Sequence, residues 1–164
     1  MAVIAEPTDF LGLNLYSRQR IEPGGSTGFR PAMATLPLLP MGYEAAPHSL
    51  GDFVRWVSKE YGNPKIYITE NGVCDNAMPE NGVINDETRI DLLGKFLAGL
   101  HGAIQDGADV RAYYQWSLMD NFEWALGNSM RFGIVYTDFE TLARIPKASA
   151  AFYSEVIRRN GVEG

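Results

Sequence analysis

The chain has 164 residues, 46% of them hydrophobic and 21% charged, and a formal net charge of −6. These fractions are typical of a soluble globular protein and argue against disorder. Residues 1–164 are therefore expected to form a single domain segment. The acidic balance, without a basic stripe, disfavours nucleic acid and membrane surfaces as partners.

The sequence also lacks the long apolar segments that direct a chain into or across a membrane. No run approaches the roughly 20 apolar residues of a spanning helix, and the start, MAVIAEPTDF, has no signal-peptide pattern. We predict a soluble, cytoplasmic protein. Cys74 is the only cysteine and is interpreted as a small loop residue. His48 and His101 lack neighbours at metal-ligand spacing, so no metal or cofactor is predicted.

The first half of the chain predicts a strand, a long loop, a helix and a second strand. Residues 9–16 (DFLGLNLY) have the apolar character of a strand, and the Gly- and Pro-rich residues 22–42 follow as a loop. A helix is indicated next by apolar residues at helical spacing: Leu50, Phe53, Val57 and Tyr61. The β-branched segment KIYIT at residues 65–69 is the second strand, and a polar loop extends from it to Asn85.

The second half predicts a helix, a strand, a short extended segment and a final helix. Asn85 is expected to cap a helix that ends near Gly107, and its apolar face is Ile90, Leu93, Leu97, Leu100 and Ile104. The strand DVRAYYQWSL follows, and after a long turn the segment FGIVYTD is extended. In the last helix, Pro146 is expected near the first turn and Gly161 just past the end.

Alternation of strands and helices indicates about three βα units of an α/β fold with a parallel sheet. Ligands bind such sheets at the carboxyl ends of the strands, in open sheets and in barrels alike. Functional groups are therefore expected just after Tyr16, Thr69 and Trp116. These strand ends carry residue types that bind sugars, namely Asn14, Tyr16, Glu70, Asn71, Trp116, Asp120, Asn121, Glu123 and Trp124.

Glu70, at the tip of an apolar strand, is the candidate for chemistry. A carboxylate held by hydrogen bonds from Tyr16 and Asn14 could attack an anomeric carbon as a nucleophile. Taken alone, a glutamate at a strand end is more often solvated or faces a helix dipole. A pair of tryptophans in a turn is, likewise, more often part of the core than a surface for a ligand. The functional interpretation depends on finding these residues on one face.

The motifs together resemble a known family. IYITENG, followed some forty residues later by WSLMDNFEWALGNSMRFGIVYTD, is similar to glycoside hydrolase family 1, which contains β-glucosidases and β-galactosidases. DFLGLNLYSR at the start and RIPKASAAFYSEVIRRNG at the end extend the similarity over nearly the whole chain. The resemblance implies the C-terminal portion, about three βα units, of a (β/α)8 TIM barrel.

It also implies roles for particular residues in a retaining β-glycosidase that acts on neutral sugars. Glu70 would be the nucleophile and Tyr16 its hydrogen-bond donor. The substrate-binding residues would be Asn14, Trp116 beneath the sugar, Glu123 and Trp124 on its hydroxyls, Phe132 in the pocket wall, and Tyr43 toward the leaving group. Tyr43 and Asn128 depart from the residues usual in the family, which leaves the leaving-group preference open. Glucose and galactose are not distinguished.

The family's acid/base residue lies in an Asn-Glu-Pro tripeptide that this sequence does not contain. Glu6-Pro7 precedes its strand and is expected at the opposite end of the sheet from Glu70. Two hypotheses follow. In the first, the chain belongs to a glycosidase whose acid/base is supplied by another segment, either a companion N-terminal barrel segment or a further copy in a barrel-like oligomer. Alternatively, it is a catalytically incomplete fragment that acts as a folding unit or a weak sugar-binding half-site.

Overall fold

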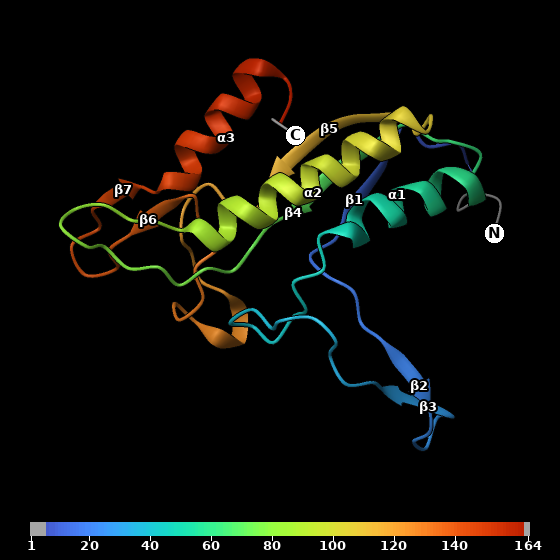
Figure 1. Ribbon diagram of the computed structural model, residues 1–164, viewed down its shortest axis with the longest axis horizontal. Helices are drawn as coiled ribbons and strands as arrows, with labels where there is room; N and C mark the ends of the chain where they lie inside the picture. Colours follow the sequence, from blue (N-terminus) through green and yellow to red (C-terminus); the bar gives the residue numbers. More distant parts are fainter. Residues whose placement is uncertain (1–5, 163–164) are drawn as a thin grey trace.

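The computed structural model describes residues 6–162, and its centre is a parallel sheet of three strands (Figure 1). The order in space is β1 (Leu11–Asn14), β4 (Ile66–Asn71) and β5 (Val110–Gln115). α1 (His48–Glu60) lies between β1 and β4 in the chain, α2 (Glu87–Gln105) between β4 and β5, and α3 (Ala148–Arg159) follows β5. The predicted βα units and parallel sheet are confirmed.

The core lies between the sheet and the first two helices. Ile66 and Ile68 of β4 are fully buried beside Leu50 and Val54 of α1 and Phe96 of α2. α1 and α2 run side by side, and their backbones come very close at one crossing (Figure 1). A Cβ on Gly51 would stand 2.5 Å from the carbonyl oxygen of Gly99, so only glycine fits there.

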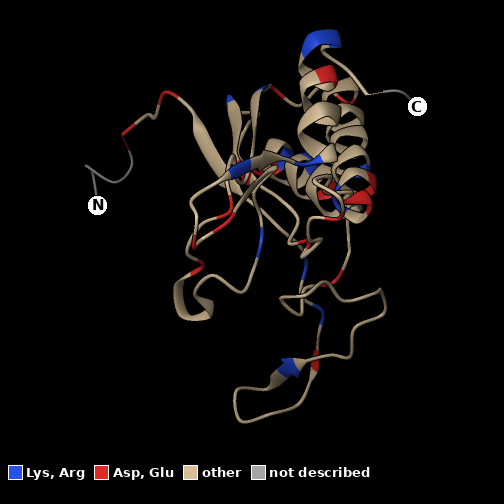
Figure 2. Cartoon of the chain, turned by 90° about the vertical axis from the view of Figure 1, so that its left-hand side faces the viewer, with Lys and Arg blue, Asp and Glu red and all other residues tan. Residues whose placement is uncertain are grey.

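The expected long loop contains a hairpin that the sequence reading missed. β2 (Ile21–Pro23) pairs antiparallel with β3 (Phe29–Pro31), and the hairpin projects away from the sheet and helices in both views (Figures 1 and 2). Three glycines in its turn region, Gly24, Gly25 and Gly28, have positive φ. These glycines, expected to lie in a loop, supply the backbone angles that a tight hairpin requires.

The start of α2 also differs from expectation, because Asp86 and not Asn85 precedes the first helical residue. Asp86 is fully buried, and its carboxylate accepts hydrogen bonds from the backbone N–H and hydroxyl of Ser149, at 2.9 and 2.6 Å. Asn85 instead donates to Glu87 at the surface. The buried face of α2 is Arg89, Leu92, Leu93, Phe96, Leu100 and Ala103. Ile104, predicted on that face, is exposed.

The chain after β5 forms a small second hairpin before the last helix. β6 (Val135–Thr137) lies within the expected extended segment FGIVYTD, whereas its antiparallel pairing with β7 (Arg144–Pro146) was not predicted. Pro146 ends β7 and stands two residues before the first residue of α3, near the first turn as expected. Gly161 does follow the end of α3, after Asn160 in a left-handed conformation. A short 3-10 helix, η2 (Trp124–Leu126), lies in the turn between β5 and β6.

Two further features of the described chain bear on partners. Within residues 6–162 no helix combines the length and apolar character needed to cross a bilayer. Lysines and arginines are scattered among acidic residues along the ribbon (Figure 2). β1 and β5 each pair only with β4 in the described sheet, so the outer edge of each strand has no neighbouring strand.

Candidate active site

Glu70 lies at the carboxyl end of β4, where the tip of the strand faces a cavity. The hydroxyl of Tyr16, two residues beyond β1, donates a hydrogen bond of 2.7 Å to Glu70 Oε2. The backbone holds the two segments together, because the N–H of Leu15 donates to the carbonyl oxygen of Glu70 at 3.0 Å. Burial and the hydrogen bond to Glu70 raise the pKa of Tyr16 well above its ordinary value. Tyr16 is thus a protonated donor to the carboxylate.

The cavity has a volume of about 360 Å³ and draws residues from the ends of all three parallel strands. It is lined by Tyr16, Tyr43, Glu70, Trp116, Asn121, Phe122, Glu123, Trp124 and Phe132. Seven of the eight sequence-predicted site residues are therefore together. Phe132 is buried and meets the ring of Tyr16 edge-on, with ring centroids 5.8 Å apart.

Asn14 is the predicted site residue that does not line this cavity. Its side-chain oxygen accepts a hydrogen bond of 2.6 Å from the Thr69 hydroxyl. It borders a neighbouring cavity, which shares Tyr16 and Tyr43 with the first. Of the two donors expected to hold Glu70, only Tyr16 is in contact with it. The side-chain oxygen of Asn14 is instead engaged by the Thr69 hydroxyl of β4.

Several polar groups in the cavity have no partner among residues 6–162. Oε1 of Glu70, the carboxylate of Glu123 and the indole N–H groups of Trp116 and Trp124 make no hydrogen bond or ion pair there. Trp124 is 83% exposed, so it is not the core residue that a tryptophan in a turn would ordinarily be. Unpaired acceptors and donors beside aromatic rings can bind the hydroxyl groups and the C–H face of a sugar.

Asn71, in contrast, is structural. Although its residue type suits a sugar, it is fully buried and both ends of its amide are occupied. Its Nδ2 donates to the carbonyl oxygen of Leu15 at 2.7 Å, and its Oδ1 accepts from the hydroxyl of Tyr113 at 2.6 Å. The next residue is a glycine, and only glycine fits there, because a Cβ at position 72 would stand 2.0 Å from the carbonyl oxygen of Trp116. In the Glu-Asn-Gly motif, therefore, only the glutamate faces the cavity.

Asp120 is likewise buried instead of facing a ligand. Its Oδ1 accepts from the ammonium of Lys147 at 2.9 Å and from the backbone N–H of Gly133 at 2.9 Å, and its Oδ2 accepts from Arg131 at 2.8 Å. Burial lowers the pKa of Lys147, and Arg89 lowers it further. Asp120 thus binds the residues on either side of Phe132 and holds Phe132 in the cavity wall.

Arg89 was not singled out in the sequence. It is fully buried in α2, forms an ion pair with Asp86, and donates to the carbonyl oxygens of Arg131 and Gly133 at 2.7 and 2.8 Å. It therefore holds the two residues on either side of Phe132. An arginine at a position that faces the core of an amphipathic helix is the signal that could have identified it.

The other acidic candidates lie away from the cavity. Glu6 is exposed and precedes the amino end of β1, opposite the strand ends that carry Glu70. Glu80, in a second Glu-Asn-Gly copy at residues 80–82, is exposed in a tight turn with Val83. Cys74 is buried, with its sulfur 3.7 Å from that of Met130. Among the residues that line the cavity, Glu70 and Glu123 are the acidic ones.

Comparison with known proteins gives one family over almost the whole chain. The model of glycosyl hydrolase family 1 matches residues 1–162. Beta-glucosidase A of Acetivibrio thermocellus is 42% identical over 167 residues, which cover 98% of this chain and 37% of that protein. Beta-glucosidase A of Thermotoga maritima is 42% identical over 166 residues, with 99% and 37% covered.

The fold agrees with these matches. The structure of a beta-glucosidase from Thermotoga maritima in complex with glucoimidazole superposes with a TM-score of 0.95 at 40% identity, over 98% of this chain and 37% of that one. The chain therefore spans a little over a third of the length of these relatives. The predicted partial (β/α)8 barrel is confirmed.

Proposed function

Because the chain belongs to glycosyl hydrolase family 1, we propose that it supplies the nucleophile side of a retaining β-glycosidase active site. The observation that carries this proposal is the cavity that gathers three strand ends around the Tyr16–Glu70 hydrogen bond. The substrates would be terminal neutral β-D-glycosides of the glucoside or galactoside type. A cytoplasmic location stays a prediction.

In the first step, the Glu70 carboxylate attacks the anomeric carbon. The bond from that carbon to the glycosidic oxygen breaks, the oxygen leaves with the electron pair and takes a proton from an acid/base residue, and a glycosyl ester of Glu70 remains. In the second step, water deprotonated by the same residue attacks the anomeric carbon and releases Glu70. Tyr16 holds the carboxylate in place by donating to Oε2, which leaves Oε1 free to attack.

The rest of the cavity fits the sugar that is transferred. Trp116 offers a flat ring for the C–H face of the sugar, while Glu123 and the indole N–H of Trp124 offer an acceptor and a donor to its hydroxyl groups. Glu123 also bears on the substrate class. An unpaired carboxylate at this position would repel a phosphate group at close range, so the site favours neutral sugars over sugar phosphates.

The acid/base residue would come from a companion N-terminal segment of the barrel. A retaining enzyme needs a second carboxyl group about 5–5.5 Å from the nucleophile, and Glu123 is assigned to the sugar. The chain spans 37% of its relatives' length. The outer edges of β1 and β5 have no strand neighbours within residues 6–162. A segment that pairs with both edges would complete the barrel and carry the missing residue. Self-association into a barrel-like oligomer, with a number of strands other than eight, is the alternative.

Covalent labelling tests the proposal. The reagent 2,4-dinitrophenyl 2-deoxy-2-fluoro-β-glucoside carries a leaving group that departs without a proton, so that labelling needs the nucleophile and not the acid. The expected result is release of one dinitrophenolate per active site and a fluoroglucosyl group on the peptide that contains Glu70. The variant Glu70→Gln should remain unlabelled, and Glu80→Gln, in the other Glu-Asn-Gly copy, should label like the unaltered chain.

Two arms of this experiment separate the hypotheses. If the chain labels only after a family member's N-terminal barrel segment is added, the companion supplies part of the sugar site. Absence of label with and without that segment would leave the chain as a folding unit or a half-site, the non-catalytic alternative.

A further inference from the structure

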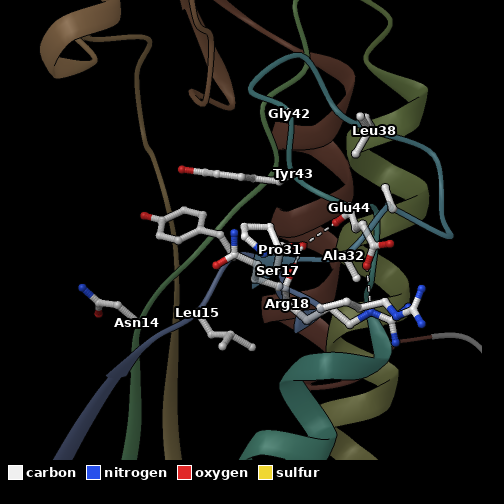
Figure 3. A pocket seen from close by; sticks show the side chains of 14 residues that line it. Asn14, Leu15, Ser17, Arg18, Pro31, Ala32, Leu38, Gly42, Tyr43 and Glu44 are labelled. Carbon is white, nitrogen blue, oxygen red and sulfur yellow. Dashed lines mark hydrogen bonds and ion pairs between the residues drawn. The ribbon is translucent and has the colours of Figure 1, made fainter. Parts of the chain in front are cut away.

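A second cavity, of about 470 Å³, adjoins the one that contains Glu70 (Figure 3). It lies between the segment after β1 and the loop before α1, and it shares Tyr16 and Tyr43 with the Glu70 cavity. Its other lining residues include Ser17, Arg18 and Glu44. Tyr43 is therefore part of the wall between the two cavities.

Tyr43 is held in that wall by its chain neighbour. Glu44 is only 6% exposed, and Figure 3 shows its carboxylate turned toward Arg18 while the Tyr43 ring points to the other side of the segment. Adjacent residues in an extended segment face opposite ways. A constraint on Glu44 therefore also fixes the side of the segment from which the Tyr43 side chain projects.

The carboxylate of Glu44 accepts more hydrogen bonds than that of an ordinary surface glutamate. Its Oε2 accepts from Nε of Arg18 at 2.8 Å, and its Oε1 accepts from the backbone N–H groups of Thr35 and Leu36, at 2.5 and 3.3 Å. The hydroxyl of Ser17 donates to its carbonyl oxygen at 2.6 Å. Glu44 thus closes the loop of residues 35–44 onto the two residues that directly follow Tyr16, onto Ser17 through its backbone carbonyl and onto Arg18 through its carboxylate.

Arg18 also contacts two residues other than Glu44, namely His48 and Thr35. Its guanidinium contacts Nε2 of His48 at 3.1 Å, at the start of α1, and donates to the Thr35 hydroxyl at 3.2 Å. Its planar fork can make these contacts at once, which a lysine could not do. The pair therefore joins three separate parts of the chain, the end of β1, the loop and α1, on the side away from the Tyr43 ring.

We propose that Arg18 and Glu44 form a positioning pair that fixes Tyr43 between the two cavities and so determines which leaving groups the Glu70 site accepts. This inference rests on the proposed glycosidase function. The sugar-binding candidates Trp116, Glu123 and Trp124 line the Glu70 cavity alone, whereas Tyr43 also borders the second cavity. A leaving group that departs from a sugar on Glu70 toward the second cavity passes Tyr43. A loosened Tyr43 would therefore affect bulky leaving groups and spare very small ones.

The test compares two reagents that share one sugar and differ only in the leaving group. Both 2-deoxy-2-fluoro-β-glucosyl fluoride and the corresponding 2,4-dinitrophenyl glycoside label the nucleophile without acid assistance. The protein is used in the form that labels, with its companion segment where that is required. The measured quantity is the ratio of the second-order labelling rates, dinitrophenyl over fluoride, before and after the substitution Glu44→Gln.

Glu44→Gln is expected to lower this ratio about tenfold, since a displaced wall misplaces the larger group, while the fluoride rate changes by less than about twofold. Arg18→Met should lower the ratio in the same way and serves if Glu44→Gln does not fold. Arg30→Met is the matched control, because it breaks the exposed Arg30–Glu22 pair in the nearby hairpin and should leave the ratio unchanged.

An equal loss of both rates would show that the pair only supports the fold, and an unchanged ratio would show that it does not govern Tyr43. Either result overturns the inference. If the unaltered protein is labelled by neither reagent, the proposed function itself fails and the inference fails with it.

Discussion

The hydroxyl of Tyr113 in β5 donates a hydrogen bond of 2.6 Å to the side-chain oxygen of Asn71, at the end of β4. The other end of the same amide donates to the carbonyl oxygen of Leu15, just after β1. One fully buried side chain thus ties together the carboxyl ends of all three parallel strands. Glu70 and Tyr16 are the immediate neighbours of two of these points.

Replacement of Asn71 by leucine should destabilise the chain, because it leaves the Tyr113 hydroxyl and the Leu15 carbonyl without their buried partner. The expected loss in the free energy of unfolding is about 1–3 kcal/mol for each group, measured by urea denaturation. Asn128→Leu, at an exposed position, is the control and should change stability by no more than about 0.5 kcal/mol. If Asn71→Leu costs as much in a Tyr113→Phe background, the bond between them is not the cause.

Asp120→Asn should be more damaging than an ordinary surface substitution. The change leaves the buried Lys147 ammonium and the Arg131 guanidinium facing a neutral amide, which we expect to cost about 3–5 kcal/mol of unfolding free energy. Asp91→Asn removes a carboxylate from the exposed pair with Lys95 and should cost less than about 1 kcal/mol. Comparable losses for the two variants in thermal and urea unfolding would contradict the role given to Asp120.

Glu44 should make the free energy of unfolding depend on pH between about pH 5 and pH 2. Hydrogen bonds from Arg18 and from the backbone of Thr35 lower the pKa of Glu44 from 4.5 to about 2. Its contribution is fully present above the unfolded value and is lost as the pH falls through the folded value. The stability difference between the unaltered chain and Glu44→Gln should therefore be constant above about pH 5 and shrink toward pH 2. A difference that does not change with pH would refute this assignment.

Tyr16→Phe should slow the labelling of Glu70 without removing it. The phenylalanine keeps the ring that packs against Phe132 but lacks the hydroxyl that holds the carboxylate. Hydrogen bonds to charged groups contribute about 1.5–3 kcal/mol, so the labelling rate should fall by roughly 10- to 100-fold. Tyr61→Phe, at an exposed position remote from the cavity, should have no effect. An unchanged rate for Tyr16→Phe would mean that Tyr16 does not orient the nucleophile.

The strands and helices that carry the site could be predicted because their apolar residues recur at the right spacing. The segment KIYIT and the helix through Leu50 and Val57 both follow such patterns. The hairpin β2–β3 could not be predicted in the same way. Its residues are largely exposed, so no burial pattern marks it, and its glycines indicate a turn without indicating paired strands.

Within the site, the sequence distinguished poorly between polar residues that face a ligand and those that bind the protein. Asn71 and Asp120 stand next to Glu70 and Asn121 in the chain, and their side-chain chemistry is equally suited to a sugar. Only the contacts of Asn71 with Leu15 and Tyr113, and of Asp120 with Lys147, separate the two groups. Such contacts join segments far apart in the chain, which spacing along the sequence does not report.

The two open edges of the sheet, β1 and β5, limit the number of strands that a partner must add to complete the barrel. Within residues 6–162 each copy of this chain has three parallel strands in one sheet, so a head-to-tail ring built from these strands contains six or nine of them, and not the eight of a (β/α)8 barrel. A twofold dimer that joins like edges would pair them antiparallel, against the direction of every strand in the sheet. Eight parallel strands require a partner with five, which a different polypeptide segment can supply and a second copy of this chain cannot.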